Sequence, residues 1–297
     1  MILGFVFRKV GLMDEEFTNK ANKFVFQAAL PALLFSDLSQ ANFRDVWNGT
    51  FVAYCALTTM ICIVISILIS CLWKDKSIQG EFVQGAYRSS AAILGIAFIQ
   101  NIYGSAGMGP LMIIGSVPLY NMMAVVVLSV FRPGQQGLDK TVVKRTMTGI
   151  VTNPIILGIV AGLLWSALGL PLSGIPGKTI GNIASMATPL GLMAMGASFD
   201  IQKAVQKGRP AIVASVMKLV GFCVIFLPVA IAFGFREEEL VAILVMLGSA
   251  TTVSCYVMAR NMGHEGVLTS STVMLTTLFS AFTLTGWLFL LRSAGLI

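Results

Sequence analysis

Charged residues are scarce in this sequence. Only 11% of the 297 residues are Asp, Glu, Lys or Arg, whereas apolar residues make up 56%. A soluble domain usually carries about a quarter charged residues, and so few charges cannot cover the surface of a soluble particle of this size. The scarcity argues against a soluble protein and indicates a chain whose solvent is lipid.

Histidine, paired cysteines and enzyme motifs are also scarce or missing. His264 is the only histidine, the five cysteines lie within apolar segments, and no CxxC spacing occurs. This argues against a Cys/His metal site, and nothing in the sequence calls for a cofactor. GxSxG, HExxH and Walker A patterns are absent, so we do not expect an enzyme.

Apolar runs of around 20 residues recur along the whole chain, and each is long enough to cross a hydrocarbon core of about 30 Å. We therefore predict an all-α polytopic membrane protein with ten transmembrane helices. The predicted spans are 1–10, 21–38, 50–72, 79–103, 108–131, 147–169, 178–199, 211–235, 238–260 and 267–291.

The net charge of +7 comes mainly from Lys and Arg in short loops, which indicates topology signals and contacts with anionic lipid headgroups rather than nucleic-acid binding. With ten crossings, nearly all of these residues fall on one side of the membrane. The exceptions are Arg44, Lys178, Arg236 and Arg292. Because cytoplasmic loops are enriched in Lys and Arg, we expect that side to be cytoplasmic, both termini to lie outside, and the location to be the cell (inner) membrane.

The spacing of similar segments indicates an internal repeat between the two halves of the chain. Pro31 and Pro189 lie 158 positions apart in similar apolar surroundings, and the same offset carries Ala97 onto Cys255. Each half then holds five spans. Because five is an odd number, the two halves have opposite orientations in the membrane, as in the inverted repeats of secondary transporters. The expected parts are 1–131, a cytoplasmic linker at 132–146, and 147–297. The same offset predicts a first helix that is truncated at its start.

Two basic residues, Arg88 and Lys218, fall at membrane depth rather than in loops. A charge there is costly, and its default interpretation is a functional site facing the interior of the bundle. The alternative is that each side chain snorkels or pairs with carbonyls at a helix end. Asp37 is expected near the opposite end of its helix, so neither cation has an evident acidic partner. An unpaired buried cation suits an anionic substrate and argues against a carboxylate-based sodium or proton site.

Small and polar residues crowd the middle of the fourth and ninth spans. The fourth contains Ser89, Ser90 and Gly95, and the ninth contains Ser254 and Cys255. Such stretches can unwind and expose half-helix N-termini that attract anions. The alternative is ordinary packing of small residues between membrane helices. Asn121 in the fifth span needs polar partners, and it either contacts substrate or stabilises the fourth helix.

The chain resembles the auxin efflux carrier family, which includes plant auxin carriers and bacterial dicarboxylate permeases. The likeness covers essentially the whole chain and rests on the order and spacing of several degenerate motifs. These motifs are Gly11–Phe17, Asn22–Phe26, Leu30–Ser36, Arg88–Ala97, Leu119–Asn121 and Asn153–Pro154.

The resemblance implies that the fourth and ninth helices break and cross near the membrane centre. It also implies a scaffold of helices one, two, six and seven, a mobile transport domain, elevator-type exchange and a homodimer. Bacterial members typically carry Asn and Pro where this chain has Ser90 and Ala97, and the crossover near Cys255 also lacks Pro. Without proline, which frees a carbonyl and forces a break, the crossover depends on Gly95, small residues and the surroundings. We expect it to survive.

The sequence therefore predicts a secondary carrier of a small organic anion such as a carboxylate. Arg88 would attract the charge, Ser89, Ser90 and the backbone around Gly95, Ala97, Ser254 and Cys255 would bind the anion, and Asn121 and Lys218 would be accessory. Two alternatives stay open. One is a cation-coupled symporter of the bile-acid type, and the other is a non-transporting sensor or degenerate relative.

Overall fold

The computed structural model describes residues 1–39, 48–91, 95–104, 107–133 and 147–297, and within these ranges the chain is helical, with no strand. Five helices are long and apolar enough to cross a membrane. They are Gly49–Ser70, Gly109–Val130, Gly174–Ala197, Gly208–Ala232 and Val267–Ser293. The polytopic all-helical class predicted from the sequence is therefore supported. The expected linker at 132–146 lies almost entirely outside the described residues.

The helices of the first half are α1 (Ile2–Lys9), α2 (Glu15–Phe24), α3 (Leu30–Ser39), α4 (Gly49–Ser70), α5 (Gln79–Tyr87), α6 (Ile96–Tyr103) and α7 (Gly109–Val130). Those of the second half are α9 (Pro154–Ala167), α10 (Gly174–Ser185), α11 (Ala187–Ala197), α12 (Ile201–Gln206), α13 (Gly208–Val216), α14 (Phe222–Ala232), α15 (Glu237–Gly248), α16 (Ser254–Asn261) and α17 (Val267–Ser293). Two π-helical turns, Val25–Ala29 and Met217–Gly221, join α2 to α3 and α13 to α14.

Side-chain caps explain where several helices start. Asp14 accepts a hydrogen bond from the Phe17 amide at the start of α2, and Asn48 accepts one from the Phe51 amide at the start of α4. Each cap satisfies a backbone N–H that has no partner within its helix.

The sixth predicted span is interrupted, which corrects the expectation of one helix over 147–169. Asn153 is extended (φ −70°, ψ 123°), and its side chain accepts a hydrogen bond from the Ile155 amide, so that α9 starts only at Pro154. Proline disfavours helical geometry in the residue before it. This accounts for a helix start at Asn153–Pro154 rather than further upstream.

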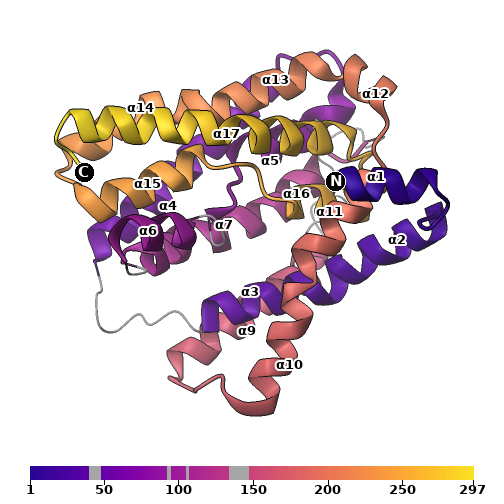
Figure 1. Cartoon of the computed structure of the whole chain (residues 1–297), viewed down its shortest axis with the longest axis horizontal. Helices are drawn as coiled ribbons and strands as arrows, with labels where there is room; N and C mark the ends of the chain where they lie inside the picture. Colours follow the sequence, from indigo (N-terminus) through magenta and orange to yellow (C-terminus); the bar gives the residue numbers. More distant parts are fainter. Residues whose placement is uncertain (40–47, 92–94, 105–106, 134–146) are drawn as a thin grey trace.

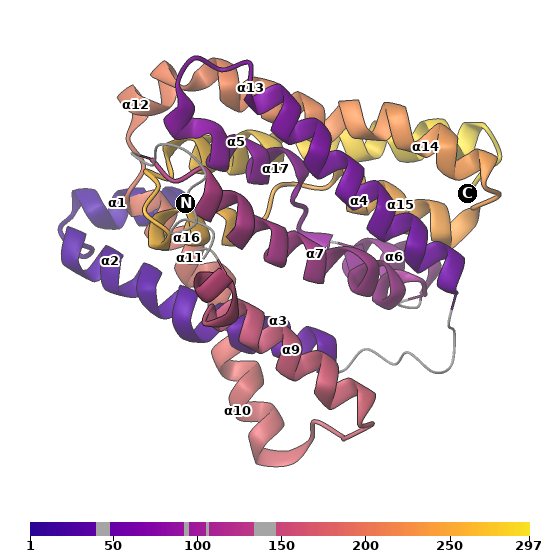
Figure 2. The same cartoon turned by 180° about the vertical axis from the view of Figure 1, so that it is seen from behind.

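The helices pack in two groups (Figures 1 and 2). In the first group, α3 packs against α9 and α10, and α11 packs against α1 and α2. In the second, α4, α5 and α7 pack together, as do α13 with α17 and α14 with α15. In both views α3, α9 and α10 lie at the end of the molecule opposite α13, α14 and α17. Helix α16 contacts both groups.

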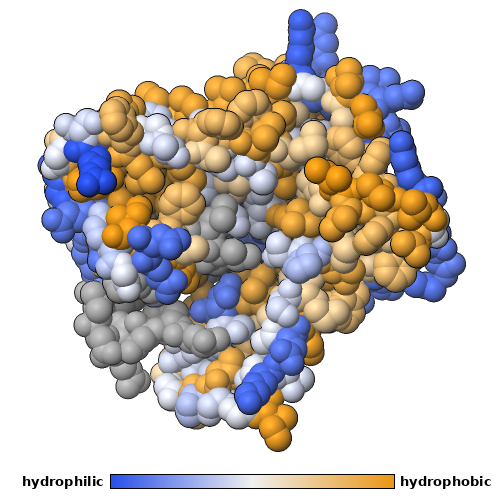
Figure 3. Space-filling view, viewed as in Figure 1, coloured by the Kyte–Doolittle hydropathy of each residue, from blue (hydrophilic) through white to orange (hydrophobic). Residues whose placement is uncertain are grey.

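Apolar side chains cover the upper part and much of the right half of the face shown in Figure 3, and hydrophilic side chains gather at its left and right edges. Helix α17 exposes Phe282 by 72% and Phe289 by 70%. An exposed apolar belt between polar ends is the pattern expected of a surface in contact with lipid.

Glycine allows the helices of the first group to approach closely. A Cβ on Gly158 of α9 would lie 2.7 Å from the backbone oxygen of Pro31, and one on Gly196 would lie 2.1 Å from the backbone oxygen of Met1. Small residues commonly permit such contact between membrane helices. The first group is thus held by backbone-to-backbone packing that larger residues would disrupt.

Replacing Gly158 by Ala should destabilise the protein by about 1–3 kcal/mol, because the added methyl group overpacks against the backbone of α3. The measurement is the thermal stability of the purified protein in detergent. The matched control is Gly181→Ala in α10, where a Cβ meets no atom within 4 Å. Equal stability of the two variants would contradict the close packing of α3 and α9.

Candidate functional site

Two predicted spans are interrupted in the middle, as the resemblance to the auxin efflux carrier family implies. Helix α5 ends at Tyr87 and α6 begins at Ile96, while α15 ends at Gly248 and α16 begins at Ser254. Arg88 and Ser249 are extended, and the Ser90 amide donates to the Ala250 carbonyl at 2.9 Å. The two interruptions therefore lie side by side and are joined through their backbones.

Both interruptions begin a few residues before the expected crossover positions. The sequence placed the crossover near Ala97 and Cys255, but Ala97 lies in the first turn of α6 and Cys255 in the first turn of α16. The breaks lie instead at the C-terminal ends of α5 and α15, where polar side chains contact the backbone.

Polar side chains complete the backbone hydrogen bonding at the breaks. The Thr251 hydroxyl donates to the Gly85 carbonyl at 2.8 Å, and the side-chain Nε2 of Gln84 donates to the Cys255 carbonyl at 2.9 Å. The Thr251 amide donates to Oγ1 of Thr276 at 3.0 Å. Backbone groups without partners cost several kcal/mol in a membrane. These contacts therefore allow two helices to stop within the bundle.

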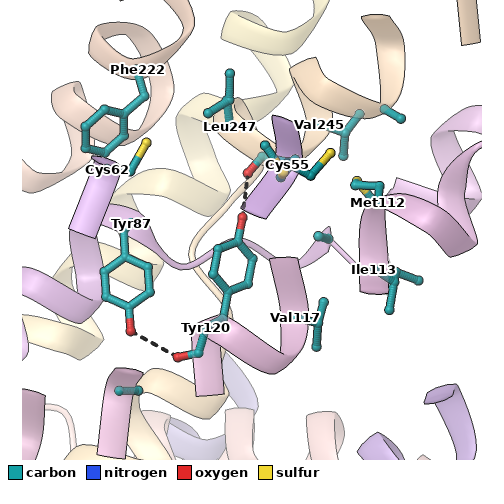
Figure 4. Close-up of a cluster of buried hydrophobic side chains, with 14 of the residues drawn as sticks. Cys55, Cys62, Tyr87, Met112, Ile113, Val117, Tyr120, Phe222, Val245 and Leu247 are labelled. Atoms are coloured by element: carbon teal, nitrogen blue, oxygen red, sulfur yellow. Dashed lines mark hydrogen bonds between the residues drawn. The ribbon is translucent and has the colours of Figure 1, made fainter. Parts of the chain in front are cut away.

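Two tyrosines support the same region from α5 and α7 (Figure 4). The Tyr87 hydroxyl donates to the Tyr120 carbonyl at 3.0 Å, and the Tyr120 hydroxyl donates to the Met246 carbonyl at 3.2 Å. Both side chains are buried. They tie α7 to the ends of the interrupted helices.

Lys218 reaches the breaks from the π-helical turn Met217–Gly221. Its side chain is 1% exposed, and its Nζ donates to the carbonyls of Leu247 (2.5 Å), Met246 (3.3 Å) and Tyr87 (3.4 Å) and to the Ser89 hydroxyl. Of the two interpretations open from the sequence, the structure favours pairing with helix-end carbonyls.

Arg88 stands at the first break and is also 1% exposed. Its Nη2 donates to Oδ1 of Asn121 at 2.7 Å and to Oγ of Ser254 at 2.8 Å, and its Nη1 contacts the Met258 sulfur at 2.9 Å. Nε has no hydrogen-bond partner in the described part of the chain. Every partner is neutral, and no described carboxylate forms an ion pair with this guanidinium.

A cavity of about 60 Å³ opens beside Arg88. Since one water needs about 10–15 Å³ by this measure, the space suits several waters or a small organic molecule. Its polar lining comprises Asp37, Arg88, Ser89, Ser90, Tyr120, Asn121, Thr188, Thr252 and Ser254. Leu30, Leu33 and Leu34 of α3 and Ala187 of α11 add apolar walls, so that both helix groups contribute to the cavity.

The structure brings together five of the predicted site residues, which are Arg88, Ser89, Ser90, Asn121 and Ser254. Gly95, Ala97, Cys255 and Lys218 do not line the cavity. A Cβ on Gly95 would lie 2.8 Å from the Met112 methyl group, so this glycine serves packing against α7.

The position of Asp37 corrects an expectation. The sequence placed it far from the cations, yet it lines the cavity from α3, opposite the breaks. Because α3 belongs to the other helix group, only the tertiary packing could show this. The argument against a carboxylate near the site therefore loses its basis.

A family comparison identifies the class of protein to which this chain belongs. The model of a family described as "Membrane transport protein" matches residues 1–288. The chain belongs to this family, which is the auxin efflux carrier family. It is a family of membrane transporters, which agrees with the expectation of no enzyme.

Two curated relatives are similar over nearly their whole length. An "Uncharacterized transporter" of Methanothermobacter thermautotrophicus is 21% identical over 97% of this chain and 93% of its own. A "Putative malonate transporter" of Rhizobium meliloti is 25% identical over 93% of this chain and 87% of its own.

Sequence reasoning missed several residues of this transporter. Gln84 and Thr251 hold the breaks, Thr188 lines the cavity, and Glu81 is a buried carboxylate on α5. The Glu81 oxygens accept hydrogen bonds from the Gly266 and Thr269 amides at 2.9 Å, at the start of α17. A signal was present, since Glu81 is the one acidic residue in the predicted span 79–103, and a charge at membrane depth indicates a functional or paired group.

The loop before α17 also carries a surface ion pair. Lys207 Nζ lies 2.7 Å from Oε2 of Glu265, and this hydrogen bond holds the pKa of the Glu265 carboxyl below its ordinary value. The pair is partly exposed, so its contribution to stability is small.

Replacing Thr251 by Val should destabilise the protein by about 1–3 kcal/mol, because the buried Gly85 carbonyl loses its hydroxyl donor without a change of shape. Thermal unfolding in detergent measures the effect. The matched control is Thr285→Val on the exposed side of α17, where the hydroxyl bonds only to its own helix. If both variants unfold like the wild type, Thr251 does not hold the break.

Proposed function

We propose that this chain is a secondary carrier of a small organic anion such as a carboxylate. The observation that carries the proposal is Arg88, a buried guanidinium with only neutral partners on the wall of a small cavity. A cation held at membrane depth without a counterion is costly, and a substrate that supplies the negative charge offsets this cost.

The neighbours of Arg88 suit a carboxylate. Asn121 and Ser254 accept hydrogen bonds from a single guanidinium nitrogen, and both line the cavity. A carboxylate can replace such neutral acceptors with two parallel, charge-assisted hydrogen bonds, which are about twice as strong. Ser89 and Ser90 then complete the polar wall.

The N-terminal end of α16 adds an electrostatic field that favours an anion. Thr252, Val253 and Ser254 line the cavity at the N-terminal end of this helix. The helix dipole is positive at this end. The dipole favours an anion over a neutral molecule at the same place. The name of the Rhizobium meliloti relative points to the same substrate class.

The proposed architecture is ten crossings in two inverted sets of five, residues 1–131 and 147–297, with 132–146 as a cytoplasmic linker. The first helix group (α1, α2, α3, α9, α10, α11) would be the scaffold, formed by predicted spans one, two, six and seven. The second group would carry the substrate by elevator-type movement. The location of the cavity between the groups supports this division. We further propose a homodimer in the cell (inner) membrane, in contact with membrane lipid.

Cation-coupled symport is a second candidate, because Asp37 lines the same cavity as Arg88. A carboxylate at this place could bind the coupling cation. Imposing either a proton gradient or a sodium gradient across proteoliposomes separates the two candidates. Saturable ligand binding without flux would instead identify a non-transporting sensor.

Replacing Arg88 by Gln should weaken malonate binding at least about 30-fold, equivalent to about 2 kcal/mol, because the charge-assisted hydrogen bonds are lost. Arg88→Lys keeps the charge but not the planar fork, and should bind with intermediate affinity. Thermal shift with malonate measures binding, and uptake of labelled malonate into proteoliposomes measures flux.

Two controls make this test specific. Lys20→Gln removes an exposed cation that pairs with Glu16 and should leave binding unchanged. Malonamide, which is neutral, should neither bind nor compete. Without ligand, Arg88→Gln should be at least as stable as the wild type, since a buried unpaired charge is removed. Unchanged malonate uptake by Arg88→Gln would contradict the proposal.

The proposed topology places both termini outside the cell. Alkaline phosphatase fused after Ile297 should be active, and green fluorescent protein fused at the same residue should be dark, because each reports the compartment in which it folds. Fusions at position 140, in the proposed cytoplasmic linker, should show the reverse pattern. A fluorescent C-terminal fusion would overturn the proposed location of the C-terminus outside.

A further inference from the structure

The C-terminal ends of α5 and α15 converge on one side chain. The carbonyls of Tyr87, Met246 and Leu247 and the Ser89 hydroxyl surround the Lys218 ammonium, and we call these four oxygen atoms the oxygen cage. Three of them are backbone carbonyls at the ends of interrupted helices. The cage is thus a product of the two breaks, not of the lysine's own helix.

The chemistry of the oxygen cage is that of an alkali-cation site. A helix C-terminus carries partial negative charge on its last carbonyls. In membrane transporters, carbonyls at unwound segments and half-helix ends coordinate sodium, and carbonyl oxygens can replace the hydration shell of a monovalent cation. The four oxygen atoms come without any carboxylate, as suits an ion of single charge.

Lys218 fills this position with a covalently attached cation. The π-helical turn Met217–Gly221 carries it, and such turns often occur at functional sites. The side chain is 1% exposed, and no carboxylate of the described residues forms an ion pair with it. The charge of the ammonium group is therefore balanced by the helix ends.

The oxygen cage lies next to the cavity but is separate from it. Ser89 alone among the four cage residues also lines the cavity, and Lys218 does not. Lys218 is thus placed to hold the crossover rather than to touch the substrate.

We propose that Lys218 is a resident cation that takes the place of a dissociable alkali ion at the crossover. The inference rests on the proposed carrier function. It excludes the oxygen cage as a site for a coupling sodium ion, because the Lys218 ammonium already fills it. The cage without its lysine would then be a binding site for an alkali cation. Removal of the lysine side chain opens a position for sodium or potassium.

The test measures the thermal stability of purified full-length protein without substrate, in sodium, potassium or N-methyl-D-glucamine chloride at equal ionic strength. The wild type should unfold at the same temperature in all three salts. Lys218→Ala should unfold at a lower temperature in N-methyl-D-glucamine. Saturating sodium or potassium should raise its unfolding temperature by about 5 °C, because an ion that binds only the folded state stabilises it by mass action.

Lys218→Met is the matched control. Its side chain fills the same space without charge, so it takes the ammonium donor away from the Leu247 and Tyr87 carbonyls and blocks an entering ion. It should be destabilised in every salt and should not respond to sodium. Lys207→Ala, which removes a partly exposed lysine outside the cage, should unfold at the same temperature in all three salts, as the wild type does.

Several outcomes overturn the proposal. One is a Lys218→Ala protein that is as stable in N-methyl-D-glucamine as in sodium and potassium. Another is a sodium-dependent stability of Asp37→Asn, because this variant lacks the cavity carboxylate that could bind sodium and keeps Lys218, so that the cage would be the remaining site. If Lys218→Ala can be purified only in sodium or potassium, the proposal is supported. Because no substrate is present, a failure here is distinct from an absence of malonate flux.

Discussion

The structure depends on how the ends of two interrupted helices are satisfied inside a membrane. Helices α5 and α15 stop within the bundle, so their last carbonyls have no partner in their own helices. In a bilayer, where water is absent, each such group costs several kcal/mol. Lys218, Thr251 and Tyr120 supply the missing donors. The interruption can therefore persist although the prolines typical of the family's crossover are absent.

This arrangement divides two buried cations between two tasks. Lys218 is engaged by helix-end carbonyls, which neutralise it without an acid. Arg88 is engaged only by neutral side chains and one sulfur, and it faces a cavity. Lys218 joins the two helix ends at the crossover. The charge of Arg88 has no anionic partner, and a substrate anion can supply one. One cation of this region is thus used for structure, and the other is available for binding an anion.

The two helix groups give this region its surroundings. Close glycine packing makes α9 and α3 a tight pair, and α3 presents Leu30, Leu33, Leu34 and Asp37 to the cavity. The cavity thus has one wall from each group, with the cation on one side and the acid on the other. A change in the relative position of the groups would alter the contacts of Arg88 and Asp37 together.

The sequence by itself determined the membrane class, because composition and long apolar runs are local properties of the chain. A charge at membrane depth drew attention to Arg88, and the family resemblance implied the interruption of two spans. The sequence also led to Ser89, Ser90, Asn121 and Ser254, which line the cavity. Tertiary structure alone decided where the breaks lie, that Lys218 binds carbonyls from α5 and α15, and that Asp37 shares the cavity with Arg88. The physical reason is that these contacts join residues far apart in sequence. Their partners are largely backbone carbonyls, which every residue carries and no sequence pattern marks.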